Sequence, residues 1–198
     1  MSTSNRPGEA QAPRTDVQQD TDEPPSPDEP GQRISGTPGA RQGAPIFVSL
    51  LDATARLRAT DLSWLDEHAT AALALTGASG EVSVRVVTDA EMASAHETHT
   101  GVGGTTDVLT FDLSEERTLH ADLLVCIDEA ERQAKSRRHA LTHELLLYIL
   151  HGSLHCLGFD DRTDDDSRRM HAEEDRLLKA IGIGEVFARR VDQLGGDA

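Results

Sequence analysis

The chain has 198 residues, a length that suits one domain, and its 35 acidic and 19 basic side chains give a formal net charge of −16. This acidic excess argues against a general nucleic-acid-binding protein, since contacts between cations and phosphates dominate such affinity, and we expect no binding to DNA. Neither a signal peptide nor a membrane-spanning run is recognisable, so we expect a cytoplasmic protein that does not enter a membrane.

The first segment, Met1–Gly43, is rich in Pro, Gly, Ser, Asp and Gln and has almost no large apolar residue. Such a composition cannot bury enough surface to offset the entropy lost on ordering. We therefore expect a disordered N-terminal extension over residues 1–43, a folded domain over 44–184 and a C-terminal tail over 185–198.

The domain is expected to begin with a strand, a helix and a second strand. Alternating apolar residues predict strands over Ile46–Leu51 and Glu81–Val87. Between them, Asp61 is expected to cap a helix that ends at Gly77.

A short helix and two further strands are expected next. The capping-box spacing of Thr88–Glu91 predicts a helix that runs through His96. The glycine-rich stretch Gly101–Gly104 predicts a flexible loop. Strands are expected over Thr106–Phe111 and Asp122–Ile127.

Three helical segments complete the domain. Asp128 and Glu131 suit a helix start, and the apolar run Leu141–Gly158 predicts a long buried helix. Thr163–Asp166 suits the N-cap and first turn of an amphipathic helix that ends at Gly182. This order of elements predicts an α+β domain in which helices cover a small mixed sheet and the apolar helix is central.

The apolar helix carries a candidate metal site. His151 and His155 are four residues apart, so both imidazoles leave the same face of the helix. Gly158 ends the helix, and Asp161 follows close enough to approach the same point. The pattern H-x-x-x-H-x-x-G-x-x-D is typical of a metzincin-type site. Two imidazoles and a carboxylate suit one Zn²⁺ per chain, with a position left open for a catalytic water.

The residues beside these ligands indicate which class of reaction the site suits. Zinc proteases with this layout carry a glutamate directly after the first histidine, as general base, and Gly152 stands there in this chain. A peptidase is therefore a minor alternative. Asp160 is a candidate catalytic residue, or a group that orients a ligand histidine.

A basic cluster directly precedes the metal helix, formed by Arg132, Lys135, Arg137 and Arg138. Two interpretations are open: a solvated helix face, or a contact with an RNA backbone beside the site. Thr106 is likewise either a residue of the substrate cleft or a residue of the turn that starts its strand.

Three segments resemble one family. HGSLHCLGFDD, residues 151–161, is similar to the H-G-x-L-H-x-x-G-[YF]-D-H signature of the YbeY endoribonucleases, the bacterial rRNA maturation factors. TTDVLTF, residues 105–111, and ADLLVCIDEA, residues 121–130, resemble two further family segments in the same order. The resemblance covers roughly residues 45–182. Two positions depart from the family pattern: Asp161 replaces a histidine ligand, and Thr100 stands about where the family has an arginine.

The resemblance implies a zinc-dependent endoribonuclease that cuts single-stranded rRNA, particularly at the 3′ end of the small-subunit precursor, in ribosome maturation and quality control. It also implies partners: the small ribosomal subunit, ribosomal proteins and a ribosome-associated GTPase. The acidic surface and the missing arginine keep an alternative open, a metal-stabilised ribosome assembly factor with little or no nuclease activity.

Overall fold

The computed structural model of the protein describes residues 45–115 and 118–184. The predicted N-terminal extension, 1–43, and the predicted C-terminal tail, 185–198, lie outside the described residues. Within the described part of the chain, no helix is both long enough and apolar enough to cross a lipid bilayer.

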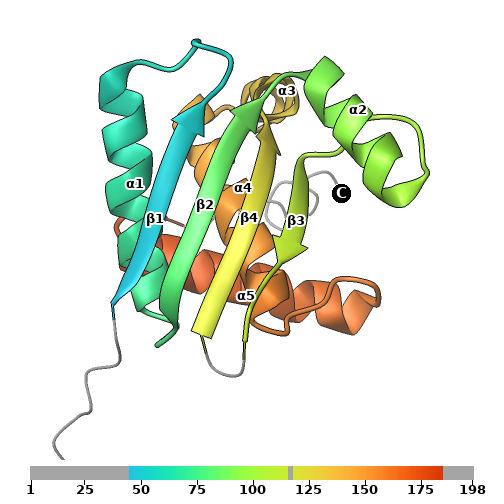
Figure 1. Ribbon diagram of the computed structural model, residues 1–198. Coiled ribbons are helices and arrows are strands. Elements are labelled where there is room, and N and C mark those ends of the chain that lie inside the picture. The colour runs from blue at the N-terminus through green and yellow to red at the C-terminus, as the bar shows by residue number, and fades with distance from the viewer. Residues whose placement is uncertain (1–44, 116–117, 185–198) are drawn as a thin grey trace, which may run out of the picture. The chain divides into compact units, whose positions relative to one another are not determined.

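The described residues contain four strands and five helices, which follow one another along the chain in the predicted order (Figure 1). The strands are β1 (Ile46–Asp52), β2 (Ser79–Val87), β3 (Val108–Asp112) and β4 (Thr118–Cys126). The helices are α1 (Ala59–Ala74), α2 (Asp89–Thr100), α3 (Ile127–Arg137), α4 (Leu141–Cys156) and α5 (Asp164–Ala180). The predicted α+β class with a small mixed sheet is confirmed.

The sheet has the strand order β1-β2-β4-β3. β1 pairs with β2 and β2 pairs with β4 in parallel, whereas β3 runs antiparallel to β4 at the edge. The parallel pairs need long crossover connections, which α1 provides between β1 and β2 and which α2 with β3 provides between β2 and β4. The short strand β3 is thereby left as the edge beside helix α4 (Figure 1).

The core lies between one face of the sheet and the helices α1, α3, α4 and α5. Helix α4 is its centre, as predicted, because it is apolar on nearly every side. Its five fully buried aliphatic side chains are Leu145, Leu146, Ile149, Leu150 and Leu154.

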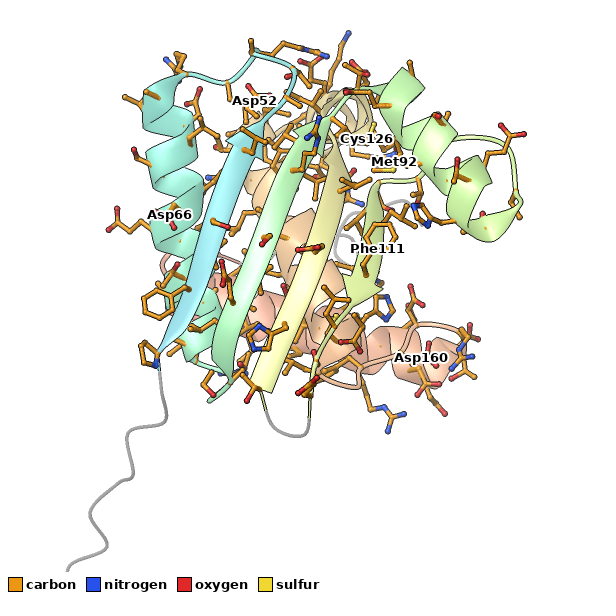
Figure 2. The ribbon with its side chains drawn as sticks, in the orientation of Figure 1. Asp52, Asp66, Met92, Phe111, Cys126 and Asp160 are labelled. Atoms are coloured by element: carbon orange, nitrogen blue, oxygen red, sulfur yellow. The ribbon has the colours of Figure 1, made fainter. Side chains whose placement is uncertain are left out.

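The opposite face of the sheet is covered only in part. Met92 of α2 packs with Val87 and Cys126 in a second, small cluster at one end. Among the described residues, no other helix covers the rest of that face, where Phe47 is 61% exposed at the β1 side and Phe111 lies on β3 (Figure 2).

Helix ends follow the predicted chemistry with one correction. Thr88 and Thr163 cap α2 and α5, and each hydroxyl accepts a hydrogen bond from the backbone N–H three residues on. The prediction that Asp61 caps α1 is wrong, since the helix begins earlier, with Arg58 as N-cap. The Asp61 carboxylate instead reaches back and accepts from the Arg58 backbone N–H at 3.1 Å.

Two strands begin at other residues than predicted. β4 begins at Thr118, four residues before the predicted start, because its pairing with β2 extends past the apolar stretch. β3 begins at Val108, so Thr106 and Asp107 lie in the loop before it.

Candidate metal centre

The structure brings the three predicted ligands together. Helix α4 places His151 one turn before His155, and Gly158, with φ +90°, lets the chain fold back towards them. The Nε2 atoms of the two histidines are 3.1 Å apart, and Asp161 carboxylate oxygens lie 3.6 Å from the first and 4.0 Å from the second. Ligand atoms around a tetrahedral zinc are about 3.3 Å apart, so the set fits this ion.

Hydrogen bonds on the outer side of the rings fix the tautomers. His151 Nδ1 lies 2.8 Å from Glu174 Oε1, and His155 Nδ1 lies 3.1 Å from the carbonyl oxygen of Phe159. Both partners are acceptors, so both Nδ1 atoms carry the hydrogen. In the neutral rings the two Nε2 lone pairs then face each other, an arrangement that a cation between them would stabilise.

Glu174 is a candidate functional residue that the sequence analysis missed. It comes from α5 and is fully buried. One carboxylate oxygen contacts His151, and the other has no hydrogen-bond partner among the residues that the structure describes. Its signal was present in the sequence: a glutamate occupies the apolar face that Met170, Leu177 and Leu178 define. A carboxylate that holds the outer nitrogen of a ligand histidine is a common feature of zinc sites.

The environment of His151 favours positive charge. Burial opposes that charge, but the hydrogen bond and negative charge of Glu174, together with Asp107 and Asp161, raise the pKa of His151 above its ordinary value. The same carboxylates that favour a proton there would favour a metal cation.

Gly152 has a structural role beside the ligands. The edge strand β3 crosses α4 at this point, and a Cβ on Gly152 would come within 2.8 Å of Thr110 Oγ1, 3.0 Å of Leu123 Cδ2 and 3.2 Å of Val108 Cγ2. The glutamate that zinc proteases carry here would not fit without displacing β3. The lack of a side chain at Gly152 therefore lets the sheet pack closely on α4.

Asp160 lies in the turn between α4 and α5 (Figure 2). Its hydrogen bonds reach the Asp161 backbone N–H and Arg162, and none that the described residues make joins it to a histidine. The hydrogen bond from Arg162 lowers the pKa of Asp160 to about 2, which suits a poor general base at neutral pH. Glu174 and the Phe159 carbonyl take the orienting role proposed for Asp160, and its catalytic role stays a prediction.

The basic cluster is partly tied into the fold. Arg132 pairs with Asp89 and Glu129, each at 2.7 Å. Arg137 pairs at 2.7 Å with Glu144, which is fully buried at the start of α4. Two of the four cations therefore hold helices together through carboxylates.

Lys135 and Arg138, the other members of this cluster, are exposed. Thr106 donates to Asp107 Oδ1 at 2.9 Å, and Thr100 donates to the carbonyl oxygen of His96 in its own helix at 2.7 Å. RNA contacts by the cluster and by Thr106 stay a prediction.

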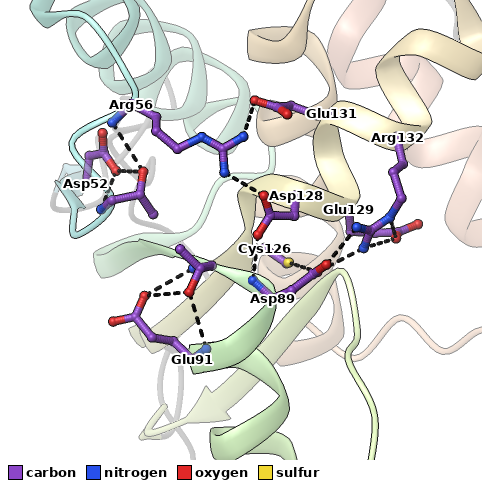
Figure 3. Close-up of polar contacts among 11 residues, drawn as sticks. Asp52, Arg56, Asp89, Glu91, Cys126, Asp128, Glu129, Glu131 and Arg132 are labelled. Atoms are coloured by element: carbon purple, nitrogen blue, oxygen red, sulfur yellow. Dashed lines mark hydrogen bonds and ion pairs between the residues drawn. The ribbon is translucent and has the colours of Figure 1, made fainter.

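A second group of possible ligands, Asp89, Cys126 and Asp128, lies at the other end of the sheet. Figure 3 shows that arginines already balance its charge, since Arg132 pairs with Asp89 and Arg56 with Asp128. Burial raises the pKa of Cys126 to about 11, so its thiol stays protonated. This network is a structural junction between α2, α3 and the loop after β1.

Comparisons with known proteins agree on one family. The family model for endoribonuclease YbeY matches residues 52–182. An endoribonuclease YbeY from an Anaeromyxobacter species is 37% identical over 123 residues, which are 60% of this chain and 64% of that protein, so the chain spans just under two thirds of its length. The protein of the same name from Moorella thermoacetica is 34% identical over 136 residues, 62% of this chain and 87% of that one.

Among solved structures, the solution structure of TM1509 from Thermotoga maritima superposes with a TM-score of 0.52. It covers 77% of this chain and 96% of that one at 23% identity, which shows a shared fold.

Proposed function

Because the chain belongs to the YbeY endoribonuclease family, we propose that it is a zinc-dependent endoribonuclease that cuts single-stranded RNA. The family match supports the class of reaction. The observation that supports a bound metal is the distance of 3.1 Å between the Nε2 atoms of His151 and His155. Their lone pairs face each other because both Nδ1 atoms donate hydrogen bonds to acceptors.

His151, His155 and Asp161 would hold the ion. When bound, zinc supplies Lewis-acid chemistry that makes water more acidic near neutral pH and stabilises charge on phosphate oxygens. Glu174 keeps the His151 ring in the tautomer that leaves Nε2 free, and the Phe159 carbonyl does the same for His155. Asp161 is 43% exposed at its side chain, so the centre opens to solvent on that side.

We further propose rRNA as the substrate, at the 3′ end of the small-subunit precursor, with roles in ribosome maturation and quality control in the cytoplasm. The net charge of −16 supports a substrate that the ribosome already holds, because free RNA would be repelled. Ribosomal proteins and a ribosome-associated GTPase are the proposed partners, and the exposed Lys135 and Arg138 are the proposed RNA contacts.

A metal-stabilised assembly factor with little or no nuclease activity is the second candidate. The pairing of Arg132 and Arg137 with carboxylates favours it, since fewer cations of the basic cluster then face an RNA backbone. A peptidase is disfavoured by the contacts around Gly152.

The deciding experiment combines metal content with cleavage of a single-stranded RNA. Wild type would be compared with His155→Ala and Asp161→Ala, and with His120→Ala as a matched control, because His120 is exposed on β4, outside the centre. We expect about one zinc per chain and RNA cleavage in wild type and control, and loss of both in the two ligand variants. Bound zinc without cleavage would favour the assembly factor, and no bound metal would refute the proposal.

A further inference from the structure

The face of the sheet that points away from α4 carries an exposed apolar patch, and we call this surface the open face. Phe47 and Leu51 on β1 are 61% and 57% exposed there. A shallow groove of about 390 Å³ crosses the same face and is lined in part by Leu51, Phe111 and Leu124 (Figure 2). Exposed apolar patches on a soluble protein commonly mark a surface that binds another molecule.

Three charged side chains lie among these apolar residues: Glu81 and Arg85 on β2 and Asp122 on β4. None of the three forms an ion pair with any residue that the structure describes. Every other arginine in the described ranges, Arg138 excepted, pairs with a carboxylate. A nucleic acid carries only negative charge and would be repelled by Glu81 and Asp122. The open face therefore suits a protein surface that carries charges of both signs.

The strand register arranges these groups symmetrically about Ser83. Glu81 precedes Ser83 by two residues and Arg85 follows it by two, so the two charges are about 13 Å apart along β2. On the neighbouring strand β1, Phe47 is the register partner of Glu81, and Leu51 is that of Arg85. At equal distances from Ser83, an anion on one side thus corresponds to a cation on the other, and an apolar side chain corresponds to an apolar one.

A second copy of the chain fits this pattern. When two open faces stack with their β2 strands antiparallel, a two-fold axis near Ser83 brings Arg85 of each copy over Glu81 of the other. The same axis brings Phe47 of each copy over Leu51 of the other, so both exposed apolar side chains are covered. A closed dimer requires a surface that is complementary to itself in this way. Stacked sheets lie about 10 Å apart, which leaves room for the side chains of both copies.

Helix α2 favours the antiparallel stack over a parallel one. Through Met92 it covers only the end of the open face where Val87 and Cys126 lie. In the antiparallel stack the α2 helices of the two copies lie at opposite ends, so each flanks the uncovered end of the partner sheet. A parallel stack would place both helices at the same end, and it would set Arg85 opposite Arg85 of the partner subunit. Like charges in register oppose that arrangement.

We propose that the open face is the interface of a two-fold symmetric dimer in which Arg85 and Glu81 pair across two stacked sheets. The metal centre lies on the other side of the sheet, where Val108 and Thr110 of β3 meet Gly152 of α4. Dimerisation would leave both centres accessible, so the inference does not depend on the proposed function. Four strands about 4.8 Å apart make a small interface, so we expect a reversible dimer with a Kd of about 1–100 µM.

Sedimentation velocity of the full-length protein, from about 1 to 500 µM at about 0.15 M salt, would measure the dimer. Arg85→Glu and Glu81→Arg each set like charges opposite one another twice, so each should weaken self-association by about tenfold or more. Mixed in equal amounts, the two variants should form a heterodimer with an affinity close to that of wild type, because each supplies the charge that the other has lost. Both substitutions in one chain should restore the affinity for the same reason.

Glu67→Arg is the matched control. Glu67 is exposed on α1, in the helix layer, and its replacement changes the net charge by as much as Glu81→Arg does. It should leave the affinity of the dimer unchanged. Asp122 is the register partner of Ser83, so the Asp122 carboxylates of the two copies approach each other near the axis. Asp122→Asn should therefore strengthen the dimer by about twofold to fivefold. Circular dichroism would check that each variant is folded.

Wild-type protein that stays monomeric over the whole concentration range would overturn the proposal. This is the result expected if an RNA or the chain's own terminal segments cover the open face instead. A dimer that neither charge reversal weakens, or one that mixing the two variants does not restore, would also overturn it. Loss in each variant with recovery in the mixture would support the pairing of Arg85 with Glu81, whether or not the protein binds zinc or cuts RNA.

Discussion

Replacing Gly152 with alanine tests the packing that places β3 against the metal helix. The new methyl group would meet Thr110 Oγ1 at 2.8 Å, Leu123 Cδ2 at 3.0 Å and Val108 Cγ2 at 3.2 Å. Each of these separations is shorter than an ordinary van der Waals contact. Thr110 is β-branched and has little freedom to rotate away, so we expect the edge strand to move.

Two effects of opposite sign set the magnitude. Overpacking of a core contact costs about 1–3 kcal/mol, and three close contacts place Gly152→Ala in the upper half of that range. Alanine is favoured over glycine in a helix interior by about 1 kcal/mol. The free energy of unfolding should therefore fall by about 1–2 kcal/mol.

Urea unfolding followed by circular dichroism would measure this change. Thr110→Ala removes the nearest atom, so Gly152→Ala should cost less by roughly 1 kcal/mol in that background than in wild type, a coupling typical of residues in contact. If Gly152→Ala were as stable as wild type, or more stable, β3 could not lie against α4 as described. The reasoning would also fail if the two substitutions were simply additive.

Three further predictions follow from buried or paired carboxylates. Glu174→Gln should lower zinc affinity by about 10–100-fold, because the Nδ1–H of His151 loses its charged acceptor. A competition titration with a zinc chelator would measure this, and an unchanged affinity would contradict it. Glu144→Ala should lower the free energy of unfolding by about 3–5 kcal/mol, since Arg137 loses its buried partner, and urea unfolding at neutral pH provides the measurement. The hydrogen bond from Arg132 lowers the pKa of Asp89 to about 2, below its value in the unfolded chain, so the stabilisation is present above about pH 4 and is lost as the pH falls through about 2. Because Asp89 is 38% exposed, its loss in Asp89→Asn should cost below about 1 kcal/mol at pH 7, and this difference from wild type should shrink towards pH 2.

Local patterns predicted the elements well. Period-two alternation identified the strands, and the capping residues Thr88 and Thr163 marked helix starts that the structure confirms. These signals involve neighbours in the sequence. The strand order and the antiparallel edge position of β3 depend on contacts between distant segments, which no local pattern encodes.

The clustering of the candidate ligands could be predicted for the same reason, because His151, His155 and Asp161 lie within eleven residues of one another. Their supporting groups could not all be found in this way. Glu174 is 23 residues from His151, and the pairing of Arg132 with Asp89 spans 43 residues. The basic cluster looked like a free cationic face because its carboxylate partners are distant or hidden in the apolar helix.

The hydrogen bond between Glu174 and His151 has a consequence for the last helix. Glu174 is a residue of α5, so a metal ion bound at His151 would be thermodynamically linked to the docking of α5 on α4. A ligand that binds only the folded arrangement stabilises it in proportion to the logarithm of its concentration over its dissociation constant. Zinc would thus lower the population of the locally open state of α5, and the rate of amide hydrogen exchange in this helix would report how much of the protein carries the ion.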